Sequence, residues 1–318
     1  MKGAVAALAL LAVNAALLPV ASAKDGRTSN AAPISSAPYV TEAPIVMLKD
    51  MESGAILFSR GADKRFAPAS MAKVMTAYVV LDLIKKGELA RETKFSVGEA
   101  TWKKWNSGNG GSTMFLSPNE KVSVDDLLKG LITVSGNDAA AVLAVGIDGS
   151  EDAFVKRMNI VAANIGMASS RFGTPNGWPD GGVTKVSAAD LITLADRLIR
   201  DHPDGYARYF SIPKLQHGTS PDGRPIVQAN RNPILGRFDG ADGLKTGHTR
   251  EAGYCFLGSA ERDGRRLIMV VAGMTSAKAR RDEAQKLMDW GFAARATAAS
   301  GHARRGGAAA SRTAGARW

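Results

Sequence analysis

The order of strand-like and helical segments limits the fold of this chain more than any other feature of its sequence. Short apolar runs typical of strands occur near both ends, at residues 45–48, 55–59, 240–246, 254–260 and 267–272. Helical spacing of apolar residues fills the region between them and returns near the end, at residues 70–86, 124–134, 138–145, 150–165, 187–199 and 278–290. We expect strands from both ends to pair in one antiparallel sheet covered by the first and last helices, with an all-helical second lobe. This mixed α/β fold places a site between the lobes.

Local signals support these segments. Asp263-Gly264 lies between the last two strand segments and predicts a hairpin turn. Ser150 and Ser187 precede helical segments as N-caps, and Gly166 follows one as a C-cap. Residues 96–119 are rich in Gly, Ser and Asn, so we expect an excursion there with only a few short elements.

The two ends of the chain have unusual compositions. Residues 1–23 combine the basic Lys2, an apolar run and the small residues at 21–23, which is the pattern of a cleaved secretory signal peptide. The alternative is an uncleaved anchor, but Asn14 and Pro19 break the run below the length of a spanning helix. We expect a periplasmic or secreted protein with four parts: a signal peptide at 1–23, a linker at 24–43, a folded domain at 44–293 and a disordered basic tail at 294–318.

The net charge of +11 does not indicate nucleic-acid binding, because its excess is concentrated at one end. Residues 294–318 hold five arginines and no acid, among Ala, Gly and Ser, and cannot bury enough apolar surface to fold. We expect the tail to make at most a weak contact with an anionic membrane or wall polymer. The aromatic residues form no basic–aromatic stripe suited to single-stranded nucleic acid, so no nucleic-acid partner is expected.

The sequence predicts neither a metal nor a cofactor. The four histidines are scattered, without H-x-x-x-H or C-x-x-C spacing, and the Gly-rich stretch at 108–111 lacks the Lys-Ser/Thr of a phosphate loop. The single cysteine, Cys255, lies in an apolar run, so we expect a small buried hydrophobic residue rather than a catalytic thiol. Without an internal disulfide, the stability of the domain depends on core burial.

Ser70 and Lys73 form the first candidate site. A spacing of three at the start of a helix places both side chains on one face. A serine hydroxyl needs a base close by, and a solvated lysine has too high a pKa to be one at pH 7. Burial and a second cation both lower a lysine pKa, the surrounding residues are apolar, and Lys245 can supply the cation. The alternative is an ordinary solvated Ser and Lys at a helix start.

Two further strings complete a set. Ser135-Gly136-Asn137 lies between helical segments: its hydroxyl and amide can enter a cleft and bind a peptide, or the string can simply end one helix and cap the next. Lys245-Thr246-Gly247 ends a strand, where Gly lets a substrate backbone lie alongside and Lys and Thr can bind a carboxylate. The alternative is an exposed edge strand. His248 has no obvious carboxylate partner, so we expect a wall residue.

The three strings, separated by about 65 and about 110 residues, resemble the active site of penicillin-binding proteins and serine β-lactamases. Ser-Gly-Asn in the middle string indicates the low-molecular-mass D-alanyl-D-alanine carboxypeptidases, serine peptidase family S11. Segments at 68–73, 135–140, 172–177 and 242–249 are all similar to that family, and the similarity covers residues 44–293. The resemblance implies a β-lactamase/transpeptidase-like fold.

The resemblance also implies a role for each residue of the set. In the catalytic group, Ser70 is the acylated nucleophile, Lys73 its general base and Ser135 a proton relay. The substrate-binding group consists of Asn137, Lys245, Thr246, Gly247 and His248. Asn137 binds the acyl-side amide, and Lys245 and Thr246 bind the terminal carboxylate. The backbone N–H of His248 forms the oxyanion hole together with that of Ser70. Some members of the family place an arginine near the carboxylate. Here Met274 takes that place by sequence, and Arg280 or Arg281 is a substitute.

The function implied is a penicillin-sensitive carboxypeptidase that removes the terminal D-Ala from peptidoglycan stem peptides, with β-lactam antibiotics as covalent inhibitors. A D,D-endopeptidase, a β-lactamase or a slow-turnover β-lactam- or wall-binding protein remain alternatives. Residues 173–177 contain no Glu to activate a deacylating water, which argues against a class A β-lactamase. Larger members continue into a β-rich domain and an amphipathic membrane helix, where this sequence has only the Ala/Arg-rich tail.

Overall fold

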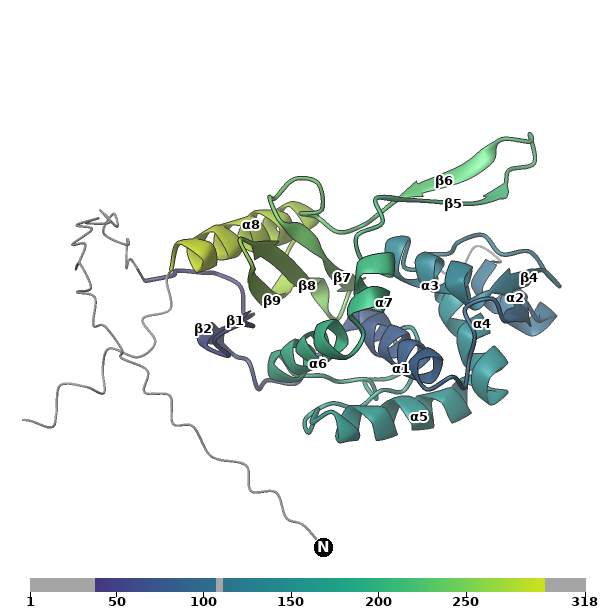
Figure 1. The fold of residues 1–318 in the computed structure, drawn as a ribbon, viewed down its shortest axis with the longest axis horizontal. Coiled ribbons are helices and arrows are strands. Elements are labelled where there is room, and N and C mark those ends of the chain that lie inside the picture. The colour runs from purple at the N-terminus through teal and green to yellow at the C-terminus, as the bar shows by residue number, and fades with distance from the viewer. Residues whose placement is uncertain (1–37, 107–110, 295–318) are drawn as a thin grey trace, which may run out of the picture. The chain divides into compact units, whose positions relative to one another are not determined.

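The computed structural model describes residues 38–106 and 111–294, which are coloured in Figure 1. Contacts divide the chain into residues 1–33 and 34–318, and every described residue belongs to the second part. The expected signal peptide at 1–23, most of the expected linker and nearly all of the expected tail lie outside the described residues. Within the described ranges, no helix has both the length and the apolar character needed to span a bilayer.

Strands from the two ends of the described chain form one five-stranded antiparallel sheet, as the sequence predicts. Its members are β1 (Ile45–Asp50), β2 (Ile56–Arg60), β7 (Ala241–Thr249), β8 (Gly253–Arg262) and β9 (Arg265–Met274), in the order β2-β1-β9-β8-β7. The N-terminal β1 pairs directly with β9 near the C-terminus. Asp263 and Gly264 both have positive φ, 51° and 77°, which confirms the hairpin turn between β8 and β9.

Both faces of this sheet are buried, so alternate residues of a strand enter different cores. In β1, Ile45 and Met47 belong to the core shared with the helical lobe, whereas Val46 and Leu48 belong to the smaller core under α8 (Ala277–Ala293). The opposite face is covered by α6 (Ala188–Asp201) together with α1 (Lys73–Lys85), as Figure 1 shows. The expectation that the first and last helices cover the sheet is therefore incomplete, because α6 packs on both β1 and β9.

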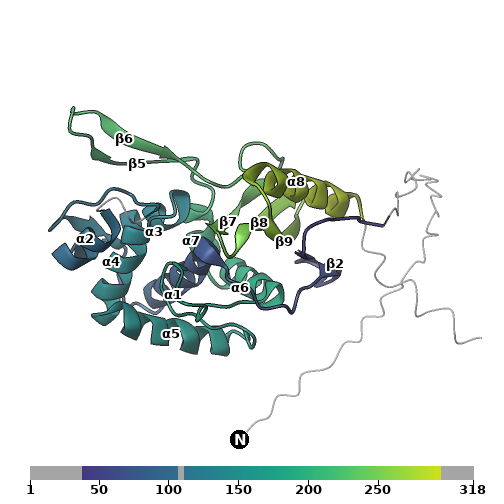
Figure 2. The ribbon, with the colours of Figure 1, turned by 180° about the vertical axis from the view of Figure 1, so that it is seen from behind.

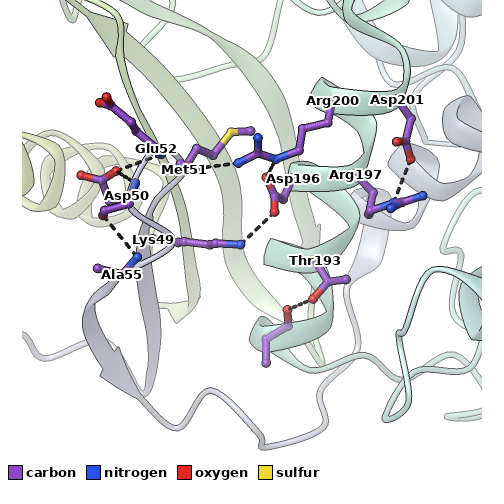
Figure 3. Close-up of polar contacts among 12 residues, drawn as sticks. Lys49, Asp50, Met51, Glu52, Ala55, Thr193, Asp196, Arg197, Arg200 and Asp201 are labelled. Atoms are coloured by element: carbon purple, nitrogen blue, oxygen red, sulfur yellow. Dashed lines mark hydrogen bonds and ion pairs between the residues drawn. The ribbon is translucent and has the colours of Figure 1, made fainter.

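Polar contacts fasten α6 to the β1–β2 end of the sheet (Figure 3). Lys49 Nζ lies 2.8 Å from Asp196 Oδ2, and Arg200 Nε lies 2.7 Å from the other oxygen of the same carboxylate. Arg200 also donates from Nη2 to the backbone oxygen of Met51 at 2.6 Å. The Asp196 carboxylate thus binds Lys49 on β1 and Arg200 on the same helix as itself, α6. These contacts fix α6 against this end of the sheet.

The helical lobe is built from α3 (Val124–Thr133), α4 (Asn137–Asp148), α5 (Glu151–Asn164) and α2 (Glu99–Asn106), with the short pair β3 (Lys94–Ser96) and β4 (Lys121–Ser123) beside them. The hydroxyls of Ser150 and Ser187 accept from backbone N–H groups three residues on, both at 3.1 Å, which confirms the predicted N-caps. The first predicted helix begins as a 3₁₀ turn, η1 (Ala69–Ala72), so Ser70 lies in that turn and Lys73 opens α1.

A helix and a hairpin that follow α6 were not expected from the sequence. Helix α7 (Pro203–Tyr209) follows α6 directly, and a separate two-stranded hairpin, β5 (Lys214–Thr219) with β6 (Pro225–Ala229), extends beyond the helical lobe in Figures 1 and 2. Most side chains of β5 and β6 are exposed or half-buried, so the hairpin lacks the apolar run on which strand prediction depends. Its turn at 220–223, Ser-Pro-Asp-Gly, was the available signal.

The last residues of the expected linker at 24–43 pack on the domain. Tyr39 and Ala43 are buried, and the Tyr39 hydroxyl donates to Glu283 on α8 at 2.8 Å. The Tyr39 ring also packs against Phe58 and Trp290, with centroid separations of 5.0 and 5.3 Å. The folded domain therefore begins a few residues before the predicted boundary at 44.

Candidate active site

A cavity of about 460 Å³ lies where the sheet meets the helical lobe. Its walls come from η1, the α3–α4 connection, the segment after α5, strand β7 and the N-terminal part of α8. The lining residues are Ser70, Gly111, Ser112, Ser135, Asn137, Asn176, Gly177, Trp178, Arg231, Thr246, Gly247, His248, Thr249, Tyr254 and Arg280. Six of the eight sequence-predicted site residues line the cavity, and the other two, Lys73 and Lys245, are buried next to lining residues.

Ser70 and Lys73 are adjacent at the base of the cavity. Lys73 Nζ lies 3.0 Å from Ser70 Oγ, 2.7 Å from Asn137 Oδ1 and 2.9 Å from the backbone oxygen of Asn176. The Lys73 side chain has no exposed surface, whereas Ser70 is partly exposed to the cavity. The lysine is thus held on three sides by oxygen atoms, and the alternative of a solvated Ser and Lys is wrong.

Burial lowers the pKa of Lys73 well below its ordinary value, and the positive charges of Lys245 and Arg231 lower it further. The carboxylate of Asp138 opposes this shift, but it is a smaller influence. The second cation expected from the sequence, Lys245, is therefore close enough to act on Lys73. A depressed lysine pKa is the property that a general base requires near neutral pH.

Two glycines allow neighbouring segments to clamp η1. A Cβ on Gly177 would lie 1.9 Å from the backbone oxygen of Ala69, and one on Gly247 would lie 2.4 Å from that of Pro68. Both distances are too short for any side chain, so only glycine permits the backbone to approach so closely. The backbone around Ser70 is therefore held from both sides, by the segment after α5 and by β7.

The α3–α4 connection brings Ser135 and Asn137 to the cavity wall. Ser135 has a φ of 65°, a left-handed conformation that turns the chain sharply between the helices. Asn137 is the first residue of α4, not its cap, and its side chain contacts Lys73. The structure therefore favours the site interpretation of this string over the capping interpretation.

Asp138, the second residue of α4, anchors the loop that contains Met114 and Leu116. Its buried carboxylate accepts from the backbone N–H groups of Met114 at 3.1 Å and Leu116 at 3.3 Å. Asn137 N donates to the backbone oxygen of Ser112 at 2.7 Å. Burial raises the pKa of Asp138, and the backbone hydrogen bonds partly offset that rise. This carboxylate positions the segment that carries Ser112 to the cavity.

Strand β7 forms the facing wall through Thr246, Gly247 and His248. Lys245 is buried rather than exposed on the wall, and its Nζ donates to the backbone oxygen of Thr246 at 3.2 Å. Burial, with the charges of Arg231 and Arg280, lowers the pKa of Lys245 to about 7. The exposed His248 ring stacks on Tyr254, with centroids 4.0 Å apart.

Arg280 lines the cavity, and its guanidinium carbon lies 5.9 Å from the centroid of the Tyr254 ring. Arg281 instead pairs with Asp282 at 3.2 Å. Met274 lies opposite Tyr254 in the β8–β9 register and does not line the cavity. Of the two substitutes considered from the sequence, the geometry thus favours Arg280.

Sequence reasoning missed Arg231, Trp178, Asn176 and Tyr254 as cavity residues. Arg231 follows β6 and donates to the hydroxyl of Ser112 across the cavity, but an isolated arginine between two asparagines gives no signal. Asn176 and Trp178 lie in or directly after the segment 172–177, which was recognised as similar to the family. That segment was the available signal for both residues.

The part of the lining that the structure describes carries positive charge and no acidic side chain, so the cavity suits an anionic ligand. Among the residues that the structure describes, no group of three His, Cys, Asp or Glu side chains is close enough to hold a metal ion. Cys255 is buried, as expected, and burial raises the pKa of its thiol to about 11.

Comparisons with known proteins agree with this geometry. The family model described as D-alanyl-D-alanine carboxypeptidase matches residues 31–276. The D-alanyl-D-alanine carboxypeptidase DacA of Haemophilus influenzae is 39% identical over 262 residues, which are 80% of this chain and 63% of that protein. DacC of Escherichia coli is 38% identical over 264 residues, 81% of this chain and 64% of that protein. The chain therefore spans less than two thirds of the length of these relatives.

Solved structures show the same fold. Penicillin-binding protein 5 from Haemophilus influenzae has a TM-score of 0.74 and 39% identity, over 80% of this chain and 72% of that one. Penicillin-binding protein D2 from Listeria monocytogenes, solved with ampicillin bound, has a TM-score of 0.69 and 33% identity, over 80% of this chain and 99% of that one. The predicted fold class, a mixed α/β architecture of the transpeptidase type, is confirmed.

Proposed function

The chain belongs to the D-alanyl-D-alanine carboxypeptidase family, and from this premise we propose that it is a serine-type carboxypeptidase acting on peptidoglycan stem peptides. In this proposal it removes the terminal D-Ala of a pentapeptide through an acyl-enzyme on Ser70. The observation that supports it best is the buried Lys73, whose Nζ lies 3.0 Å from Ser70 Oγ. Nucleophile and base are thus in contact before any substrate binds.

The hydrogen bonds around Lys73 can accommodate a neutral amine. A neutral Nζ has two N–H groups, and two carbonyl oxygens, Asn137 Oδ1 and Asn176 O, lie within 2.9 Å to accept them. The remaining lone pair then faces Ser70 Oγ and can take its proton. An ammonium form would be a buried charge beside Lys245 without a carboxylate in contact, which burial strongly disfavours.

The reaction then proceeds in two steps. Ser70 Oγ attacks the carbonyl carbon of the penultimate D-Ala while Lys73 takes the hydroxyl proton. The peptide C–N bond breaks, the departing amine of the terminal D-Ala receives a proton relayed through Ser135, and an ester to Ser70 remains. Water hydrolyses this ester in the second step. We assign the backbone N–H groups of Ser70 and His248 to the developing oxyanion, which such donors stabilise strongly.

We assign recognition of the terminal carboxylate to the β7 wall. The Thr246 hydroxyl lines the cavity, Arg280 reaches it from α8, and the buried Lys245 lies directly behind. The absence of any acidic side chain from the lining supports an anionic substrate end. The same argument supports covalent inhibition by β-lactams, which carry a carboxylate next to a strained amide.

A Glu-assisted β-lactamase is less well supported. Such an enzyme needs a carboxylate at the cavity to activate the deacylating water, and the lining holds none. The observation does not separate a carboxypeptidase from a D,D-endopeptidase, because both use the same acylation chemistry.

We also propose that the enzyme works outside the cytoplasm, after removal of residues 1–23, with a catalytic domain that begins near Tyr39 and extends through α8. The sequence pattern of the N-terminus and the peptidoglycan substrate support this placement.

The test of the function is incubation of the protein, from residue 24 onward, with pentapeptide muropeptides, followed by mass spectrometry. We expect loss of one alanine and accumulation of the tetrapeptide, with the Ser70→Ala variant inactive. Cleavage of cross-linked dimers without trimming of pentapeptides would instead identify an endopeptidase. No cleavage of either substrate would contradict the proposal.

A further inference from the structure

Trp178 is a large aromatic residue on the cavity wall that the reaction itself does not use. It is 39% exposed and lines the cavity beside Asn176 and Gly177. Its backbone is fixed, because its N–H donates to Asn176 Oδ1 at 2.9 Å. The preceding residue, Gly177, is held against the turn that carries Ser70. The position of the indole is therefore tied to the position of the nucleophile.

The indole ring is also held from behind. Trp105, which is buried, meets it edge to face with centroids 5.4 Å apart and an interplanar angle of 79°. On another side the ring packs on Gly111, where a Cβ would lie 2.9 Å from Trp178 Cζ3. A ring packed in this way is a rigid surface, and its contact with a ligand costs little conformational entropy.

The position of the ring identifies the part of the ligand that it faces. The same Cβ position on Gly111 lies 3.5 Å from Asn137 Nδ2, so Trp178 is on the Asn137 side of the cavity. Thr246, on β7, and Arg280, on α8, are the residues to which we assign the terminal carboxylate. With the acyl-side amide on Asn137, as the resemblance to the family implies, the ring lies beside the acyl half of the substrate.

We propose that Trp178, supported by Trp105, is a specificity-determining wall that binds an apolar or aromatic side chain of the acyl group. This inference rests on the proposed acylation of Ser70 and adds to it the class of acyl donor preferred. Covering an exposed indole face removes apolar surface from water, and aromatic contacts add a geometric preference. The wall contributes to binding and positioning, and takes no part in proton transfer.

Two penicillins of different side chain test this wall. Benzylpenicillin carries a phenylacetyl group on the acyl side, whereas 6-aminopenicillanic acid has the same fused rings and carboxylate without that group. We expect Trp178→Ala to lower the acylation rate constant for benzylpenicillin roughly three- to tenfold, the range that one aromatic contact provides. The rate for 6-aminopenicillanic acid should change less than about twofold, and Trp178→Phe should restore most of the benzylpenicillin rate.

A matched control is Phe115→Ala, which removes an aromatic side chain that is 53% exposed and does not line the cavity. It should leave both rates unchanged. Equal losses for both penicillins in Trp178→Ala, or no loss for benzylpenicillin, would overturn the wall while leaving the acylation of Ser70 intact. Wild-type protein that reacts with neither penicillin would contradict the proposed function itself, on which the wall depends.

Discussion

The proposed chemistry depends on one lysine being kept neutral. Lys73 is fully buried, contacts three oxygen atoms and lies near the charges of Lys245 and Arg231. The apolar residues around it in the sequence predicted this burial. The sequence did not predict the backbone oxygen of Asn176, more than a hundred residues away, because tertiary packing alone brings it there.

Replacement of Lys73 by arginine tests its role as the base. Arg keeps the positive charge but does not give up a proton near neutral pH, so it cannot accept one from Ser70. We expect Lys73→Arg to lower acylation by a fluorescent penicillin by several orders of magnitude, more than the ~10²–10³ typical of losing one oxyanion donor. Stopped-flow labelling measures the rate constant of this acylation. An Arg variant within tenfold of wild type would show that another group is the base.

Lys245 should give carboxylate recognition its own pH dependence. Its pKa of about 7 means that the empty site carries this charge below pH 7 and loses it above. We therefore expect KM for a D-Ala-D-Ala substrate to rise as the pH increases through 7, while Lys245→Arg, always charged, shows a flatter profile. A wild-type KM that is constant between about pH 6 and 9 would contradict this assignment.

The same residue can be tested with a modified substrate. Lys245→Gln removes the charge, which should cost roughly 10–100-fold in kcat/KM for a substrate with a free terminal carboxylate. An amidated analogue has no carboxylate to lose contact with, so its already low rate should change little. Equal losses on the two substrates would show that Lys245 supports the site in another way.

At the scale of elements, the clamp on η1 links fold to function. Gly247→Ala would place a methyl carbon 2.4 Å from the backbone oxygen of Pro68 and push β7 and η1 apart. We expect a stability loss of about 1–3 kcal/mol and a fall in acylation rate of roughly a hundredfold, because small displacements of a nucleophile are costly. Thermal unfolding and penicillin labelling measure the two effects.

Gly98→Ala is the matched control, since a Cβ there meets no atom within 4 Å and Gly98 has no positive φ. It should leave both stability and labelling near wild type. If Gly247→Ala behaved like this control, the close approach of β7 to η1 would not be needed for placing Ser70.

The sequence predicted those elements whose residues show a clear apolar pattern or a recognisable boundary residue. Strands β1, β7, β8 and β9 are largely buried on both faces, and helices such as α6 begin at a serine cap, so the sequence predicted these elements. Helix α7 and the β5–β6 hairpin lack such patterns. Arg231 and Trp178 gain their place at the cavity only from packing between segments distant in sequence, which no local pattern records.

At the scale of the molecule, the catalytic domain should not need the residues beyond α8. Ala294 is the last described residue, and its backbone oxygen accepts from Arg265 Nη2 at 2.9 Å, so the end of α8 is fastened to β9. We expect a chain ending after Ala294 to keep full carboxypeptidase activity and an unchanged unfolding temperature. A loss of activity on this truncation would show that residues 295–318 contribute to the site.

The same residues should provide only a weak attachment to membranes. Trp318 is their only large apolar residue, and their arginines attract anionic surfaces through a field screened within about 8–10 Å at physiological salt. In fractionation, we expect the protein to be soluble or to wash off membranes with moderate salt. Retention that resists high salt and disappears when 295–318 are deleted would contradict this expectation.

The pairing of β1 with β9 also limits how early in folding the proposed active site can form. Ile45 pairs with Ala272 in β9. In a chain that is synthesised or exported from its N-terminus, β1 therefore emerges long before β9. During that interval β1 has an unpaired edge, which invites association with other chains. Closing so long a loop is also slow. Because β7, which clamps the turn of Ser70, emerges late as well, we expect the proposed nucleophile to reach its place only after β7 has paired, and a growing chain to be inert until then.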